Sequence, residues 1–134
     1  APKQVKLYTD GGSRGNPGPS ATGYALLDQN NEVIVKKGEY IGITTNNQAE
    51  YKALLFGLKE AKRLGVTVVN VFMDSQLIVN QMTGAYKIRN EDLLPIYKEI
   101  KLLIENFDQV TFTHVPRELN KLADSMVNEA LDAQ

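Results

Sequence analysis

The chain has 134 residues, of which 43% are hydrophobic and 23% charged, the balance of an ordinary soluble globular protein with a core of its own. It has no cysteine, which excludes disulfide frameworks and thiolate metal sites, and no apolar run approaches the roughly 18 residues of a membrane span. The net charge of −1 is low for a nucleic-acid binder. If four of the 16 acidic residues hold metal ions, however, 12 remain against 15 Lys and Arg, an excess of +3.

The sequence shows no internal division. It contains no linker, repeat or low-complexity segment, and no signal-peptide pattern opens it. We therefore expect one domain over residues 1–134, a monomer without membrane anchor or obligate protein partner, located in the cytoplasm.

The first part of the chain predicts three strands. Alternation of Val5, Leu7 and Thr9 with the residues between them predicts a strand that stops at Asp10. Residues 11–19 hold four glycines and two prolines and are expected to form a loop. Two further strands, over residues 21–28 and 32–40, are joined by a hairpin-like turn.

The remainder alternates helices with strands. A helical period begins at Thr45 and stops at Gly65, and residues 66–73 read as a central strand buried on both faces. The later elements are helices over 75–83 and 91–107, a strand over 110–115 and a helix over 119–131. The order βββαβααβα indicates an α/β sheet whose early strands form a meander and whose later strands use helical crossovers.

Four acidic residues fall where the expected elements meet. Asp10 and Asp74 end two strands, and Glu50 and Asp124 lie in the first turns of two helices. The carboxyl ends of strands are where ligands bind in open α/β sheets, so the four carboxylates can converge on one point. Clustered carboxylates repel unless cations are present, and hard oxygen ligands without cysteine or paired histidine favour Mg²⁺ or Mn²⁺ over zinc.

Each acid also has a purely structural interpretation. Asp74 with Ser75 could cap the helix that follows, Glu50 could interact with a helix dipole, and Asp124 could be a solvated helix acid. Convergence of all four is what favours a functional site.

At this point the motifs resemble those of ribonuclease HI, in that family's order and from end to end of the chain. The segments that carry the resemblance are Tyr8-Thr9-Asp10-Gly11-Gly12-Ser13, Thr45-Asn46-Asn47-Gln48-Ala49-Glu50-Tyr51, Asp74-Ser75-Gln76 and Asn120-Lys121-Leu122-Ala123-Asp124. The run from His114 to Asn120 resembles the compact archaeal and bacterial branch. Larger relatives carry a basic protrusion where this chain has only residues 84–90, with Lys87 and Arg89.

The resemblance implies the ribonuclease H fold, an α/β fold with a mixed five-stranded sheet in the order 3-2-1-4-5. It also implies an endonuclease that cuts the RNA strand of an RNA–DNA hybrid with two divalent cations, Mg²⁺ or Mn²⁺, and leaves 5′-phosphate and 3′-hydroxyl ends. Asp10 would bridge the two ions, Asp124 would help to hold the one that activates water, and Glu50 with Asp74 would hold the other.

The same resemblance implies contacts to the hybrid, largely independent of base sequence. Backbone groups of Gly11, Gly12 and Ser13 would lie near the cut strand, because glycine allows close approach. The residues matching minor-groove contacts of the family are Asn16, Asn46 and Gln76, and those matching a DNA-phosphate pocket are Thr45 and Asn90. A third pocket member, an arginine in some relatives, is replaced by Ile43.

Two of these amides have structural alternatives. Asn16 could belong to the turn that contains it, and Asn46 could cap the long helix.

His114 and Arg117 compete for an auxiliary catalytic role. His114 matches a histidine that some relatives use for product release or proton transfer, and Arg117 could replace it in this branch. By parity His114 shares a strand face with Val110 and Phe112, so a packed histidine without catalytic function is the alternative.

Three rival functions remain open from the residues alone. An inactive nucleic-acid binding module should lack one of the acids, and all four are present. A DNA-cutting enzyme of the same superfamily usually lacks the Thr-Asn-Asn segment and the glutamine after the third acid. An unrelated carboxylate enzyme such as a glycosidase would use two acids and no metal.

Overall fold

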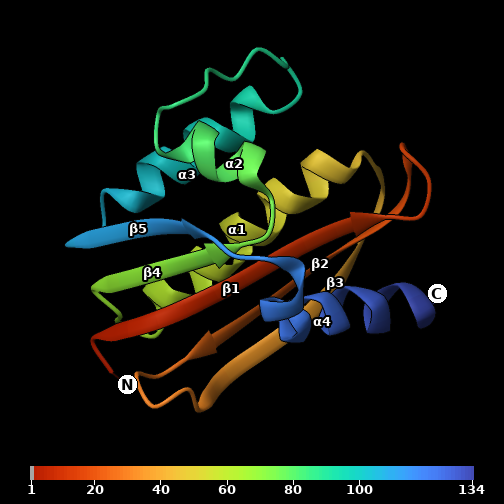
Figure 1. The fold of residues 1–134 in the computed structure, drawn as a ribbon. Coiled ribbons are helices and arrows are strands. Elements are labelled where there is room, and N and C mark those ends of the chain that lie inside the picture. Colours follow the sequence, from red (N-terminus) through yellow and green to blue (C-terminus); the bar gives the residue numbers. More distant parts are fainter. Residues whose placement is uncertain (1) are drawn as a thin grey trace.

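The computed structural model describes residues 2–134 and contains one five-stranded sheet in the order β3-β2-β1-β4-β5 (Figure 1). This is the order that the family resemblance implied, so the expected fold class is confirmed. The elements in chain order are β1 (Gln4–Ser13), β2 (Gly18–Leu27), β3 (Val33–Thr44), α1 (Asn46–Arg63), β4 (Val68–Met73), α2 (Gln76–Met82), α3 (Leu94–Ile104), β5 (Gln109–His114), the 3-10 helix η1 (Arg117–Leu119) and α4 (Lys121–Asp132).

Helices cover both faces of the sheet. On one face α1 packs against β1 and β2, with α3 beside α1 and α2 next to β5; on the other face α4 packs against β1, β2 and β3 (Figure 1). The main core lies between the sheet and α1 and includes Leu7, Leu54 and Val71, all fully buried. A smaller cluster under α4 contains Ala21, Val127 and Leu131. No helix within residues 2–134 is long and apolar enough to cross a membrane.

The expected end of the first strand at Asp10 is wrong. β1 continues through Gly11, Gly12 and Ser13, which pair with β2, so the loop predicted over residues 11–19 shrinks to residues 14–17. Gly11 is needed for a close approach and not for a turn, because a Cβ on it would lie 2.2 Å from the carbonyl carbon of Ala49 in α1. The parallel pairing of β1 with β4 ends at Tyr8, so Asp10 still lies beyond the carboxyl end of that pair.

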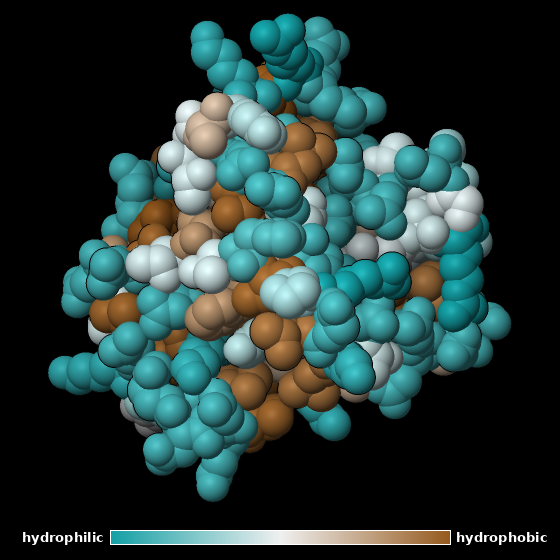
Figure 2. Space-filling view, in the orientation of Figure 1, coloured by the Kyte–Doolittle hydropathy of each residue, from teal (hydrophilic) through white to brown (hydrophobic). Residues whose placement is uncertain are grey.

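The expectation that β4 is buried on both faces is also wrong. Its buried residues are Val69, Val71 and Met73, whereas the alternate residues remain partly exposed. The reason is that α4 covers the other half of the sheet, and hydrophobic patches accordingly reach the surface over this side of the molecule (Figure 2). On the less covered face Phe72 stacks on Tyr8 of β1 at 4.9 Å between ring centroids.

The helix ends follow local rules. Thr45, and not Asn46, caps α1 through a capping box with Gln48, and Gly65 ends the helix with a φ of 78°. Two helices are shorter than predicted. α3 begins only at Leu94, and Pro95 fits the first turn of this helix. α4 begins at Lys121, after the 3-10 helix η1.

Candidate active site

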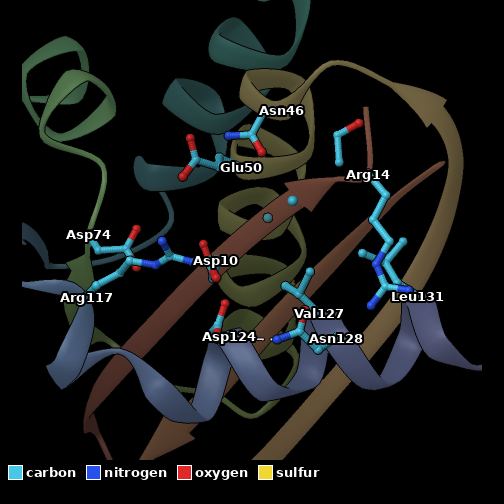
Figure 3. Close-up of a pocket in the computed structure, with 13 residues that line it drawn as sticks. Asp10, Arg14, Asn46, Glu50, Asp74, Arg117, Asp124, Val127, Asn128 and Leu131 are labelled. Carbon is cyan, nitrogen blue, oxygen red and sulfur yellow. Dashed lines mark hydrogen bonds between the residues drawn. The ribbon is translucent and has the colours of Figure 1, made fainter. Parts of the chain in front are cut away.

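Four carboxylates from four elements meet in one open cleft (Figure 3). Asp10 comes from β1, Glu50 from α1, Asp74 from the end of β4 and Asp124 from α4. Carboxylate oxygens of Asp10, Glu50 and Asp74 all lie within 4.8 Å of one another, and Asp124 lines the same cleft. The cleft has a volume of about 380 Å³, and its polar lining includes Gly11, Gly12, Ser13, Asn46 and Asn128.

The electrostatics of the cluster are unfavourable for four anions. Burial, followed by repulsion from Asp74 and Glu50, raises the pKa of Asp10 from 3.8 to about 8. Burial and repulsion from Asp74 raise the pKa of Glu50 from 4.5 to about 8. Among the four acids, the pKa values of Asp10 and Glu50 are therefore raised strongly.

The donor set fits divalent cations with a preference for oxygen ligands. Within residues 2–134 none of the four carboxylates forms a salt bridge to Lys or Arg. Closely spaced carboxylate oxygens in a solvent-open cleft are the ligands that Mg²⁺ and Mn²⁺ take.

Asn120 organises the site, and no pattern in the sequence points to this role. It is 1% exposed, and its Nδ2 donates to the backbone carbonyl of Thr9 at 2.9 Å and to Oδ2 of Asp74 at 3.3 Å. An asparagine directly before a helix reads as an N-cap, yet its side chain makes no cap bond to α4. It ties β1, the end of β4 and the entry to α4 together beside the acids.

Two glycines set how closely α4 approaches the sheet. A Cβ on Gly23 would lie 2.3 Å from the carbonyl oxygen of Ala123, and one on Gly38 would lie 2.2 Å from that of Met126. Only residues without side chains leave room for the backbone of α4 at this depth. Because α4 lies this low over β2 and β3, Asp124 reaches Asp10.

The other expected contact residues divide between two hollows and the outer surface. Asn16, Thr45 and Asn90 line a second hollow of about 650 Å³ together with Ser13 and Asn46. Oδ1 of Asn16 accepts a hydrogen bond from the backbone N–H of Asn46 at 3.0 Å, so its side chain reaches α1 and does not serve only its own turn. Gln76 is exposed at the start of α2 and lines neither hollow.

The structure separates His114 from Arg117. His114 is exposed at the end of β5, so the packed-histidine alternative is wrong, and it does not line the cleft. Arg117 lines the cleft, and its guanidinium points between Asp74 and Asp10 (Figure 3). Strand parity predicted the correct sheet face for His114. At the end of β5, however, no other element within residues 2–134 covers that face enough to bury the histidine.

Comparison with known proteins identifies the family. The sequence model described as "Reverse transcriptase-like" matches residues 8–130. Ribonuclease HI of Halobacterium salinarum is 43% identical over 96% of the chain, and the crystal structure of RNase H1 from that archaeon superposes with a TM-score of 0.95, covering 98% of this chain and 99% of the other. The chain belongs to the ribonuclease H family.

Other ribonuclease H relatives extend beyond the matched region. A bifunctional protein of Mycobacterium tuberculosis is 41% identical over 97% of this chain, but the match spans only 36% of that protein, and the match to the Halobacterium protein spans 65%. An RNase H1 named LC11 was solved in complex with an RNA/DNA hybrid; it is 41% identical with a TM-score of 0.92, over 96% of this chain and 97% of the other.

Proposed function

We propose that the chain is an endonuclease that cuts the RNA strand of RNA–DNA hybrids with the help of two divalent cations, Mg²⁺ or Mn²⁺. The observation that carries this proposal is the convergence of four carboxylates, none in a salt bridge among the described residues, in a cleft beside the backbone of Gly11 and Gly12. The relative solved with an RNA/DNA hybrid supports the choice of substrate.

The chain's own residues would hold the ions and the scissile phosphate. Asp10 lies between the other acids and is suited to bridging two cations, with Asp124 on one side and Glu50 and Asp74 on the other. When bound, such ions supply Lewis-acid activation of water and stabilise the leaving 3′ oxygen, which gives 5′-phosphate and 3′-hydroxyl ends. Asn120 would keep the carboxylate of Asp74 oriented throughout, because its amide also anchors to β1.

Selection of RNA at the cut strand requires contacts to the 2′-hydroxyl, which both donates and accepts hydrogen bonds. Gly11, Gly12 and Ser13 line the cleft directly after Asp10 and leave room for the sugar to approach. Asn46 lines both hollows and could reach base edges in the minor groove, where acceptors are common to all sequences. We therefore propose cutting that is largely independent of sequence, with Gln76 as an outer contact.

The DNA strand would lie over the second hollow. Thr45, Asn16 and Asn90 offer hydroxyl and amide groups there, and no cationic side chain lines it among the residues described. Ile43, which replaces an arginine of some relatives, is 66% exposed. Phosphate recognition in this hollow would thus use neutral donors, and the grip on DNA should be modest.

A cleavage panel tests the proposal. The RNA strand of a hybrid is end-labelled and incubated with Mg²⁺, with Mn²⁺ or with chelator, beside duplex DNA, single-stranded RNA and double-stranded RNA. We expect cutting of the hybrid RNA strand in either metal, no cutting in chelator and intact duplex DNA. Efficient cutting of duplex DNA would indicate a DNA-acting relative instead, and binding without cleavage would indicate an inactive module.

A further inference from the structure

The cleft extends beyond the four carboxylates and ends at a second arginine. From Asp124 it continues past Asn128 to Leu131 on α4, where Arg14 faces the helix from the hairpin between β1 and β2 (Figure 3). Arg14 and Arg117 are the two cationic residues among those that line the cleft, and they lie at opposite ends of it.

The backbone of Arg14 is held firmly. Its N–H donates to the carbonyl of Pro19 at 2.8 Å, which closes the hairpin. Gly18 packs so closely against it that a Cβ there would lie 2.4 Å from the carbonyl oxygen of Arg14. The arginine therefore projects from a fixed point at the rim of the cleft and does not depend on a flexible loop.

The side chain of Arg14 is weakly engaged within the chain. Its Nη2 contacts Oδ1 of Asp132 at 2.6 Å, but the two side chains are 50% and 68% exposed. Exposed ion pairs of this kind contribute little to stability, and this one leaves most of the guanidinium fork open to another acceptor. Asp132 can hold the side chain near the cleft without competing strongly with a phosphate.

We propose that Arg14 binds a phosphate of the RNA strand that flanks the cut, at the end of the cleft formed by α4. This contact depends on the proposed function, because a strand whose scissile phosphate lies over the carboxylates would place a neighbouring phosphate further along the same cleft. The acids occupy the centre, so the flanking phosphates meet cationic groups only at its two ends. Arginine suits this position because its planar fork can contact two phosphate oxygens at once.

The test measures hybrid binding separately from cleavage. Fluorescence anisotropy with a labelled hybrid in Ca²⁺, over a series of salt concentrations, compares wild type with Arg14→Ala. The matched control is Arg63→Ala, which removes an exposed arginine that pairs with Glu60 outside the cleft. We expect Arg14→Ala to weaken binding roughly fivefold and to make the slope of log K against log salt shallower by about 1, as for one lost phosphate contact, and Arg63→Ala to change neither.

Neutral methylphosphonate linkages then locate the contact. At one position on the RNA strand near the cut, the neutral linkage should weaken wild type as much as Arg14→Ala does, with no further loss in the variant. Asp132→Asn should bind as wild type or tighter. Unchanged binding and slope in Arg14→Ala, coupling only to DNA-strand linkages, or equal losses in Asp132→Asn and Arg14→Ala would each overturn the proposal. Intact binding by wild type without cleavage would instead overturn the proposed function.

Discussion

Replacing Asp10 by asparagine should stabilise the metal-free protein while abolishing cleavage. Asp10 lies among three other carboxylates and forms no salt bridge within the described residues, and burial and repulsion raise its pKa to about 8. In the unfolded chain the same carboxyl returns to a pKa near 3.8. The folded state thus binds a proton that the unfolded state releases between these two values.

The sign and size of the effect follow from this difference. Because the folded pKa is raised, the contribution of Asp10 is most favourable below about pH 4 and is lost as the pH rises towards 8. A difference of about four pKa units corresponds to at most about 5 kcal/mol. The site is open to water and counterions and can relax, so we expect a gain of roughly 2 kcal/mol for Asp10→Asn at pH 7.5.

Urea unfolding in chelator measures the effect directly. The stability of wild type should fall between pH 5 and 8, whereas Asp10→Asn should show a flatter profile and exceed wild type only at the upper end. Saturating Mg²⁺ should reverse the order, because the cations bind only the folded wild-type site tightly. If Asp10→Asn is less stable than wild type at pH 7.5 in chelator, the carboxylates do not repel one another as the structure indicates.

Further predictions concern residues around the acids. Arg117→Ala should lower kcat at least tenfold, equivalent to about 1.4 kcal/mol, and Arg117→Lys should recover part of the loss, whereas His114→Ala should retain most of the activity. The reverse pattern in folded variants would assign the auxiliary catalytic role to His114. Asn120→Ser, which removes the amide that bonds to Asp74 and to β1, should weaken Mg²⁺ binding in calorimetry, and wild-type affinity in this variant would exclude the positioning role of Asn120. Gly23→Ala should displace α4 and lower both thermal stability and metal affinity, and a variant with wild-type metal affinity would show that the depth of α4 does not matter. The salt dependence of wild-type hybrid binding should be shallow, with a slope on the order of −2 to −4, and a slope near −8 would reveal an overlooked basic surface.

Periodicity predicted the elements well, but it could not distinguish the reasons for glycine. A glycine-rich run after a strand usually marks a turn, so the sequence predicts Gly11 and Gly12 in a loop. In the structure they continue β1, where Gly11 allows the close approach of α1 and Gly12 faces Val127 of α4. These approaches depend on tertiary packing and leave no local signature. The loop that does exist, over residues 14–17, is shorter and is followed by Gly18, the first residue of β2.

In the site, the sequence indicated which acids converge but not how the residues around them are arranged. The convergence of the acids could be expected because each lies next to an element end, and the topology brings those ends together. The role of Asn120 could not, because its two partners, Thr9 and Asp74, are 111 and 46 residues away in sequence. The exposure of His114 depends on how far the helices cover β5, which strand parity does not report.

The most direct test of the central claim is single-turnover cleavage of a hybrid with a labelled RNA strand, with Mg²⁺ titrated into metal-free wild type and Asp10→Asn. If the four carboxylates form one site for divalent cations that cut RNA, wild type should be inactive without metal, its rate should rise with Mg²⁺ and plateau, and Asp10→Asn should stay inactive at every concentration. Cleavage by wild type in excess chelator, or Mg²⁺-dependent cleavage of the RNA strand by Asp10→Asn at a comparable rate, would contradict the account.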